Sequence, residues 1–399
     1  MILAKRTKLM KPSPILALAA KANELKASGK DVVSMTIGEP DWDTYASIKD
    51  AAIASIKEGK TKYTPANGIL DLRKAIAEQI SSDMKLDYTP AQVTVTSGAK
   101  FILFSALQTL CDPGDEVILP APFWASYGTM VELAEARPKI VLCGPETNFK
   151  LTGKNLEGAI NPKTKVLLLN SPSNPTGMFY SREELKAVAE VLRKHPQVVV
   201  ISDDIYNRLC HEDCDLAPHM LHVAPDLRDR VLVMNGASKS YAMTGWRLGW
   251  AAGPQALIDA MTAYSSQAVS CASATSQYAA LHAIKNSEPD VKKTVALLKQ
   301  RRDFIMGELN KIDGINAFKP EGAFYIWMDV QKFIGRKHRG VEMHGSADLS
   351  AALLDHHLVA VVPGVEFGVE GYFRLSFAVD NSKAKIACDR MREFFAELK

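Results

Sequence analysis

The sequence predicts an α/β protein, with a large domain on a seven-stranded, mainly parallel sheet and a second, smaller α+β domain. Through the middle of the chain, apolar runs rich in β-branched residues alternate with helical stretches, a pattern typical of α/β units. Runs such as 166–169 and 198–201 are hydrophobic at every position, which indicates strands covered by helices on both faces. The length of 399 residues allows two domains or one unusually large one.

Seven apolar segments are predicted as the strands of the large sheet. In chain order they are Gln92–Thr96, Glu116–Leu119, Lys139–Leu142, Lys165–Leu169, Val198–Ser202, Val231–Met234 and Leu248–Ala252. Helices are expected between several of them, for example at Phe101–Leu110 and Arg182–Lys194. The chain shows no fixed-period repeat and no low-complexity tract, which argues against a solenoid or a propeller.

After this block the pattern changes. Residues Pro289–Ile312 predict one long amphipathic helix, with Gly314 as a stop. Short strands at Ala323–Met328, Val359–Val362 and Tyr372–Ala378 and helices near Ala347–His356 and Ser382–Leu398 follow, and we expect this unit to recruit Ser13–Val33. The predicted parts are an N-terminal arm with a piece of the small domain (1–45), the large domain (46–288), and the connecting helix with the C-terminal small domain (289–399).

Composition argues against several classes of protein. Lys and Arg number 48 against 45 Asp and Glu, a net charge of +3, so we expect no binding to nucleic acid or anionic lipid. The apolar runs fall far short of the ~18 residues of a membrane helix, and Met1–Lys8 lacks the apolar core of a secretory signal. The six cysteines are scattered and are expected to be reduced. These features together predict a cytoplasmic protein.

The sequence motifs give little support for a nucleotide-binding site or a zinc site. Gly59-Lys60-Thr61 ends like a phosphate-binding P-loop, but the first glycine of that motif would fall on Ala54. No G-x-G-x-x-G run follows a predicted strand, as a dinucleotide-binding domain requires. A zinc pattern is also missing from a crowded group of five residues, Cys210, His211, Cys214, His219 and His222. We interpret this group as a polar surface loop and predict no metal.

Two predicted strands end in turns suited to a phosphate group. Ser97-Gly98-Ala99-Lys100 leads straight into a helix, and the free N–H groups at a helix N-terminus bind anions. Asn235–Ser240 follows another strand, and Arg247 stands eight residues after Lys239. A lysine and an arginine near a second strand end would complete a phosphate pocket.

Two more strand ends add an acid and an amide. Asp203 follows one strand directly, Asn170–Gly177 follows another, and Phe123-Trp124 supplies an aromatic pair after a third. Ligands of open α/β sheets bind beyond the carboxyl ends of the strands, so these groups should converge. Pyridoxal 5'-phosphate needs this combination, because its aldehyde takes a lysine amine, its ring nitrogen a carboxylate and its phosphate helix-end donors.

Several motifs resemble those of class I aminotransferases of fold type I, which depend on pyridoxal phosphate. They are Gly38–Asp41 (GEPD), Asn174–Gly177 (NPTG), Ser202–Tyr206 (SDDIY), Ser238-Lys239 with Arg247, and Phe373–Ser376 (FRLS). Four more resemble the bacterial subgroup of aspartate aminotransferases: Lys60–Gly68, Ser97–Lys100, Met243–Arg247 and Val362–Gly364. The match runs in order from about Met10 to the C-terminus, which is highly specific for the family and less so for the substrate.

The resemblance implies one catalytic residue, Lys239, which would bond to the cofactor aldehyde and shuttle the proton between the substrate Cα and the cofactor C4′. Asp203 would keep the ring nitrogen protonated, while Tyr206 and Asn174 would bond the phenolic oxygen and Trp124 would stack on the ring. The resemblance implies phosphate contacts from Gly98, Ala99, Ser238 and Arg247, with Tyr63 reaching in from the other subunit of a homodimer.

For the substrate, the resemblance implies that Arg374 binds the α-carboxylate as a bidentate fork. Gly38 would let the chain pass close to that carboxylate, and Trp124 and Asn174 would also contact the substrate. Lys100 is associated with the distal carboxylate of aspartate or glutamate, and Lys11 would help with dicarboxylic or prephenate-like substrates.

The chain departs from the family pattern at two places near this site. Gly236 stands three residues before the lysine, where many relatives have a hydroxyl residue that binds the phosphate, so one contact must come from elsewhere. In many relatives the segment that begins at Gly38 reads G-E-P-D-F-D-T-P, whereas this chain has Trp42 and Tyr45 within it. We expect these two positions to lie near the substrate entrance.

The resemblance implies a homodimer that moves the amino group of L-aspartate to 2-oxoglutarate, giving oxaloacetate and L-glutamate by a ping-pong route. The alternatives are an aminotransferase for aromatic amino acids, prephenate or alanine, and a lyase that acts at Cβ or Cγ with the same cofactor. A non-catalytic regulator of aminotransferase-like fold is disfavoured. Such regulators carry an additional N-terminal DNA-binding module, whereas the Gly38 motif stands near the start of this chain.

Overall fold

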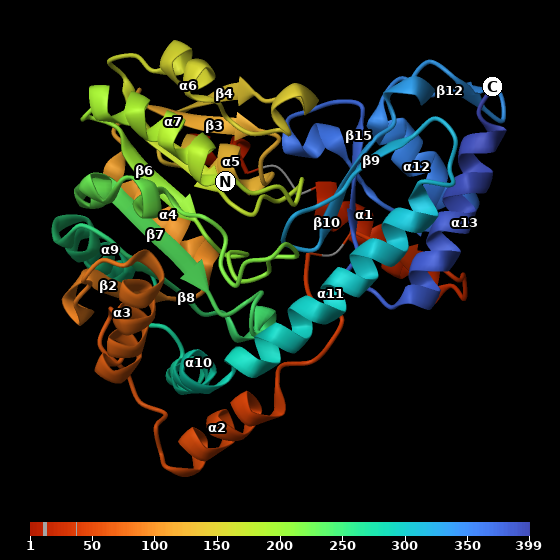
Figure 1. Ribbon diagram of the computed structural model, residues 1–399. Coiled ribbons are helices and arrows are strands. Elements are labelled where there is room, and N and C mark those ends of the chain that lie inside the picture. The colour runs from red at the N-terminus through yellow and green to blue at the C-terminus, as the bar shows by residue number, and fades with distance from the viewer. Residues whose placement is uncertain (11–13, 37) are drawn as a thin grey trace.

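The computed structural model describes residues 1–10, 14–36 and 38–399. A sheet with helices around it forms one part, and the C-terminal strands and helices form another, with the long helix α11 (Glu288–Leu309) running from the first to the second (Figure 1). Within the described ranges, no helix is long and apolar enough to cross a membrane. The six cysteines are free thiols, as predicted.

A seven-stranded sheet forms the centre of the first part. In spatial order its strands are β2 (Val93–Thr96), β8 (Gly249–Ala252), β7 (Val231–Gly236), β6 (Val199–Asp203), β5 (Thr164–Asn170), β3 (Glu116–Ala121) and β4 (Arg137–Leu142). β8 runs antiparallel to β2 and β7, and the other neighbouring pairs are parallel. The predicted α/β fold with a mainly parallel, seven-stranded sheet is therefore confirmed, and the strand ends shift by only a residue or two.

Strand β5 shows why its sequence is apolar at every position. Leu167 and Leu169 pack into one hydrophobic cluster, whereas Val166 and Leu168 pack into another. Successive side chains of a strand point to opposite faces, so a strand covered on both faces has no polar side. The register with β6 pairs Leu168 with Ile201, which continues the second cluster across the sheet.

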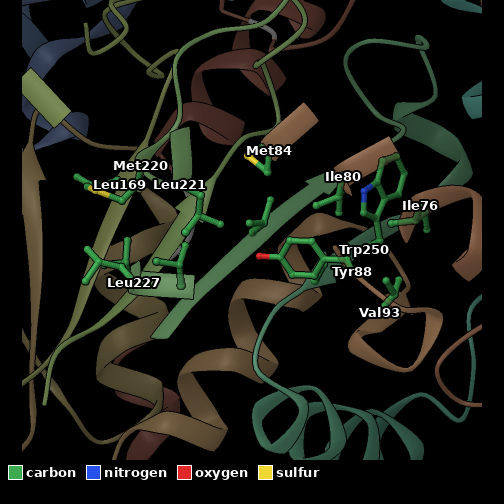
Figure 2. Packing of buried hydrophobic residues seen from close by; sticks show 14 of the residues in the cluster. Ile76, Ile80, Met84, Tyr88, Val93, Leu169, Met220, Leu221, Leu227 and Trp250 are labelled. Atoms are coloured by element: carbon green, nitrogen blue, oxygen red, sulfur yellow. The ribbon is translucent and has the colours of Figure 1, made fainter. Parts of the chain in front are cut away.

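Helices cover both faces of this sheet. On one face lie α4 (Ala99–Leu110), α5 (Ser126–Leu133) and α9 (Gln255–Ala268). On the other lie α3 (Leu70–Met84), α6 (Gly153–Ala159), α7 (Arg182–Lys194), α8 (Met220–Val223) and α10 (Ala274–Asn286), with α2 (Ala46–Lys57) packed on α10. Figure 2 shows Ile76 and Ile80 of α3 near Tyr88, Val93 and Trp250 in this second core.

The C-terminal part has its own four-stranded antiparallel sheet and its own core. The strands follow in the order β14 (Val362–Pro363), β15 (Tyr372–Ser376), β10 (Tyr325–Asp329) and β9 (Asn316–Phe318), with α12 (Ser346–His357) and α13 (Asn381–Glu397) packed nearby. β1 (Val33–Ser34) pairs in parallel with β13 (Val359–Ala360), which brings α1 (Pro14–Ala27) to this part. The domain boundaries at residues 45 and 288 stay a prediction.

Two predicted strands of the C-terminal part differ from the structure. The predicted strand Val359–Val362 is split between two sheets, because Val359–Ala360 pairs with β1 whereas Val362–Pro363 pairs with β15. The predicted strand from Ala323 begins at Tyr325 instead, since Ala323 adopts a φ of 56°, outside the β region.

The predicted surface loop at residues 210–222 is also wrong in part. Cys210, His211 and His219 are buried. Cys210 forms an isolated β-bridge with Gly322, and His211 Nε2 lies 2.6 Å from the carbonyl oxygen of Ala323. These contacts hold Cys210 and His211 against the C-terminal part, whereas Glu212, Asp213 and Asp215 of the same segment are exposed.

Candidate active site

A cavity of about 510 Å³ opens at the carboxyl ends of β5, β6 and β7, beside the C-terminal sheet. Its lining includes most of the predicted site residues, namely Gly38, Ala99, Lys100, Trp124, Asn174, Asp203, Tyr206, Ser238, Lys239, Arg247 and Arg374. Tyr63 does not line it, and its side chain is 91% exposed. Lys11 lies outside the described residues. The structure thus brings together groups from five strand or helix ends that are far apart in the sequence.

The start of α4 and Arg247 form the cationic end of the cavity. Gly98 precedes the helix with a φ of 92°, and a Cβ atom there would lie 2.6 Å from Arg247 Nη2. Glycine is therefore needed both for the backbone conformation and for the approach of the guanidinium group. The free N–H groups of the first helical turn, next to this cation, make a site for an anion.

Lys239 is buried and has an unusually low pKa. Its Nζ donates a hydrogen bond to the carbonyl oxygen of Gly38. Burial lowers the pKa of Lys239 to about 8; the Glu39 carboxylate opposes this shift, whereas the Arg374 and Arg247 guanidinium groups add to it. A lysine with such a pKa is partly neutral near physiological pH, which makes it able to act as a nucleophile and as a base.

Asp203 ends β6 and points its carboxylate into the same cavity. Its Oδ2 accepts a hydrogen bond of 2.6 Å from the Tyr127 hydroxyl, and its Oδ1 accepts one of 3.3 Å from the Ile205 N–H. Burial raises the pKa of Asp203 to about 6, and the two hydrogen bonds and Lys239 limit the rise. A cation beside this carboxylate would stabilise its charged form.

Arg374 lies within β15 and is almost completely buried. Its Nη1 donates to Asn174 Oδ1 at 3.1 Å and its Nη2 donates to the carbonyl oxygen of Thr36. Its Nε finds no hydrogen-bond partner among the described residues, although it is buried. A buried donor without a partner is costly, so this guanidinium group is prepared for an acceptor that enters the cavity.

A tyrosine pair closes the cavity next to Arg374. The hydroxyl groups of Tyr206 and Tyr325 lie 2.8 Å apart, and the Arg374 guanidinium lies 4.6 Å from the centre of the Tyr325 ring. A Cβ atom at Gly38 would lie 2.6 Å from the Tyr325 hydroxyl. Any residue with a side chain at position 38 would therefore displace this hydroxyl. These contacts fix the position of the guanidinium group.

Lys100 is a fourth basic side chain in the lining. Its Nζ lies 4.7 Å from the centre of the Trp124 ring and 3.4 Å from Ser126 Oγ. Burial and the nearby Arg247 lower the pKa of Lys100 from its ordinary value. This side chain has no carboxylate partner within ion-pair distance among the described residues, so it is available to an anionic ligand.

The two departures from the family pattern have structural reasons. A Cβ atom at Gly236 would lie 3.0 Å from the carbonyl oxygen of Leu248 and 3.3 Å from the Ala99 Cβ, so the position is tightly packed. Trp42 and Tyr45 do not line the cavity, and their expected place near the substrate entrance stays a prediction. The Tyr45 hydroxyl instead bonds Thr294 Oγ1 at 2.6 Å, because this segment runs against α11.

Two residues that the sequence did not single out belong to the site. Tyr127 holds Asp203, and Tyr325 holds Tyr206. Tyr127 follows Trp124 by three residues at the start of α5, and the two rings pack edge to face at 5.4 Å. Helical spacing from Trp124 is the one sequence signal that could have pointed to Tyr127.

Comparison with known proteins assigns the chain to a family. Residues 30–391 match the family model for aminotransferase class I and II. The chain belongs to this family. This aminotransferase is 45% identical over 390 residues to an aspartate/prephenate aminotransferase of Cereibacter sphaeroides, with 98% of this chain and 97% of that protein covered.

Solved aminotransferases are also similar in structure. The aspartate aminotransferase from Rhizobium meliloti matches with a TM-score of 0.96 and 40% identity, over 100% of both chains. The aspartate aminotransferase from Thermus thermophilus, solved with maleate, matches with a TM-score of 0.91 and 38% identity, over 99% of this chain and 100% of that one. The aminotransferase thus has the fold type I architecture, and its family implies pyridoxal phosphate as cofactor.

The residues of the cavity fit that cofactor. The donor set includes a lysine that is partly neutral, a buried carboxylate, a helix start with a guanidinium group and an aromatic ring. Gly98 leaves a space next to Arg247 that a Cβ atom would fill. These are the groups that an aldehyde, a pyridine nitrogen and a phosphate require.

Proposed function

We propose that this aminotransferase moves the amino group of L-aspartate to 2-oxoglutarate and gives oxaloacetate and L-glutamate by a ping-pong route. The observation that carries the proposal is one cavity in which Lys239 is accompanied by Arg374, with its unpartnered Nε, and by Lys100. Two cations beside the reactive lysine suit a substrate with two carboxylates. The names of the similar proteins agree with this, and maleate is itself a dicarboxylate.

Lys239 is the proposed catalytic residue. Pyridoxal phosphate, when bound, supplies an electron sink for the charge that develops at the substrate Cα. The amine of Lys239 would hold the cofactor through its aldehyde and, when free, would take up and return the proton of the substrate Cα. A pKa lowered to about 8 by burial leaves enough neutral amine for both tasks.

The remaining residues on the sheet side hold the cofactor. Asp203, oriented by Tyr127, is placed to keep the ring nitrogen protonated, and its raised pKa would fall next to that cation. Tyr206 and Asn174 are assigned to the phenolic oxygen, and Trp124 to the face of the ring. The phosphate contacts are assigned to Gly98, Ala99, Ser238 and Arg247.

A homodimer would complete the site. Tyr63 projects into solvent, 91% exposed, and lies away from the cavity of its own chain. Ile53 and Ile56 on α2 and Leu70 at the start of α3 are also large apolar side chains that are exposed. Burial of these side chains against a second copy would stabilise a dimer and carry Tyr63 to the phosphate of the partner site.

The two ends of the substrate are assigned to the two free cations. Arg374 binds the α-carboxylate, for which its planar fork is suited, with Gly38, Trp124 and Asn174 around it. Lys100 binds the distal carboxylate. Aspartate and glutamate differ by one methylene group, so the same pair of cations can serve both halves of a ping-pong reaction. The assignment of Lys11 stays a prediction.

Prephenate is the second candidate for the amino acceptor. It also carries two carboxylates, and the similar Cereibacter sphaeroides protein is named for both aspartate and prephenate. The distal carboxylate of prephenate could use Lys100 in the same way as that of aspartate. Aromatic amino acids and alanine lack this second carboxylate, so we expect them to be poorer substrates.

Absorption spectra of the purified holoenzyme test the proposal. Added L-aspartate should bleach the visible cofactor band, and 2-oxoglutarate should restore it with one equivalent of L-glutamate formed. Parallel half-reactions with prephenate as acceptor, and with phenylalanine and alanine as donors, rank the alternatives. A protein that carries no cofactor, or a cofactor band that aspartate leaves unchanged, would overturn the proposal. Release of ammonia together with the keto acid would show a lyase instead.

A further inference from the structure

A cluster of three metal-ligating side chains lies in the C-terminal part, outside the cofactor cavity. His338 ends β11 (Lys337–His338), His357 ends α12, and Glu397 ends α13. One ligand atom of each lies within 4.8 Å of the others, and in the described part of the chain this is the one group with that property. None of the three lines the cavity that holds Lys239.

The geometry of the cluster resembles that of a metal site. His338 Nε2 lies 2.9 Å and His357 Nε2 lies 3.4 Å from the same oxygen, Glu397 Oε2. The two imidazoles therefore direct their Nε2 atoms to the same carboxylate oxygen, so the three candidate ligand atoms lie together. Zinc bonds of about 2.0–2.1 Å in a tetrahedron place ligand atoms about 3.3 Å apart, close to these separations.

The side chains are held in place before any ion enters. The His338 side chain is 1% exposed and that of His357 is 8% exposed. The ring of Phe394, one helical turn before Glu397, packs against both imidazoles at centroid distances of 5.0 and 5.5 Å. An ion would therefore meet two fixed ligands and would lose little binding energy to ordering them.

Solvent reaches the cluster from the side of Glu397, which is 43% exposed. A water molecule can complete a four-coordinate shell there, as it does in zinc sites with two histidines and one glutamate. Arg339 Nε stands 3.8 Å from Glu397 Oε2 and would repel a cation. The Arg339 side chain is 57% exposed, however, so it can turn away into solvent.

The cluster joins three chain segments at the end of the protein. β11 pairs with β12 (Val341–Glu342) in a short hairpin. The backbone of Lys337 exchanges two hydrogen bonds with that of Lys399, so the hairpin and the C-terminus lie together, as Figure 1 shows near β12. An ion held by His338, His357 and Glu397 would fasten the ends of α12 and α13 to this hairpin.

We propose that His338, His357 and Glu397 form a binding site for one zinc ion, with water as the fourth ligand, that stabilises the C-terminal part. The site is independent of the cofactor and of the proposed transamination. It differs from the sequence-based prediction of no metal. Its three ligands come from positions 338, 357 and 397, whose spacing gives no zinc pattern, so only the fold brings them together.

Calorimetric titration of the full-length holoenzyme with zinc chloride tests this site. The protein is prepared without a polyhistidine tag and treated with EDTA beforehand. We expect one tight equivalent per chain in the wild type. The substitutions His357→Gln and Glu397→Gln should each weaken binding by at least about tenfold. Zinc should also raise the melting temperature of the wild type and should fail to do so in these variants.

A histidine outside the cluster gives the matched control. His344 lies on the loop between β12 and α12, with an exposed side chain, and His344→Gln should bind zinc like the wild type. The visible cofactor band and the metal-free melting temperature of each variant show that it has folded. Absence of tight binding in the wild type, or equal affinity in the cluster variants and the control, would overturn the proposal.

Discussion

The sheet side of the active-site cavity and its C-terminal side hold their polar groups in different ways. On the sheet side, Asp203 ends β6 and Lys239 follows β7, and these two neighbouring parallel strands bury apolar residues on both faces. On the C-terminal side, Arg374 stands within an antiparallel strand and is held by Asn174 and Thr36 from two other segments. The first side is fixed by one sheet, whereas the second is assembled from several segments.

This difference separates two kinds of recognition. In the proposed function, residues on the sheet side hold the phosphate and the ring of the cofactor, which both half-reactions share. Arg374 is assigned to the substrate, which enters and leaves, and its Nε has no hydrogen-bond partner among the described residues. Variants of the sheet side should therefore change the cofactor spectrum and turnover together, whereas variants of Arg374 should leave the spectrum intact.

Lys239→Ala should give the largest effect on the sheet side. Turnover should fall at least about 10⁴-fold, because both the covalent partner of the aldehyde and the proton carrier are lost. The visible band of the bound cofactor should shift as well. Steady-state rates with aspartate and an absorption spectrum measure both. Lys194→Ala, at an exposed lysine on α7, is the control and should retain full activity. Near-normal turnover of Lys239→Ala would contradict the assignment of Lys239 as the catalytic residue.

The sheet side is also the part that sequence could predict well. Asp203 follows an apolar run that can only be a covered strand, and Lys239 follows another. Strand ends of this kind are local features, and the topology of α/β sheets places them at one edge. For this reason the cavity contains nearly all of the residues predicted at strand ends.

On the C-terminal side, the sequence predicted only part of the cavity lining. Arg374 was predicted from a motif, but Tyr325 was not. Tyr325 meets Arg374 because the register of β10 and β15 pairs Trp327 with Arg374 and leaves Tyr325 as its diagonal neighbour on the same face. A register between strands that lie far apart in the chain cannot be derived from either strand alone. The grouping of His338, His357 and Glu397 likewise depends on contacts between distant segments, so the spacing of these residues in the chain could not indicate it.

Arg374→Lys should give the largest effect on the C-terminal side. A lysine carries the charge but cannot form the planar pair of bonds, so kcat/KM for aspartate should fall by about 10²- to 10³-fold. The cofactor band should keep its position and intensity. Steady-state kinetics and the spectrum of the same preparation check this. Loss of the cofactor from this variant would show that the two sides are not separable.

Lys100→Ala should act on one class of substrate. The substitution removes the partner of the distal carboxylate, so rates with aspartate and glutamate should fall by about tenfold to a hundredfold. Half-reactions with alanine and phenylalanine should change little, because these substrates have no second carboxylate. The measurement is the ratio of the half-reaction rate constant with aspartate to the rate constant with alanine or phenylalanine. An equal loss for substrates with and without a second carboxylate would contradict the assignment of Lys100 to the distal carboxylate. The effect of the substitution would then come from the lost contact with Trp124.

Tyr127→Phe should give the smallest effect and an effect that depends on pH. The Tyr127 hydroxyl donates to the Asp203 carboxylate and so lowers the pKa of Asp203, which burial raises to about 6. Removal of the donor should raise this pKa further. Because the ionised carboxylate is the active form, activity is lost as pH falls through the pKa, and the acid limb of kcat/KM should move to higher pH.

The pH profile separates this positioning role from a general loss of stability. At alkaline pH, Asp203 is ionised with or without Tyr127, so Tyr127→Phe should approach wild-type activity there and fall increasingly behind as the pH is lowered. Tyr180→Phe removes another buried hydroxyl, which bonds the Leu151 N–H and lies outside the cavity. It should lower stability by a similar amount and leave the acid limb in place. An acid limb that stays fixed in Tyr127→Phe, or moves equally in both variants, would mean that Tyr127 only fills space beneath the ring of Trp124.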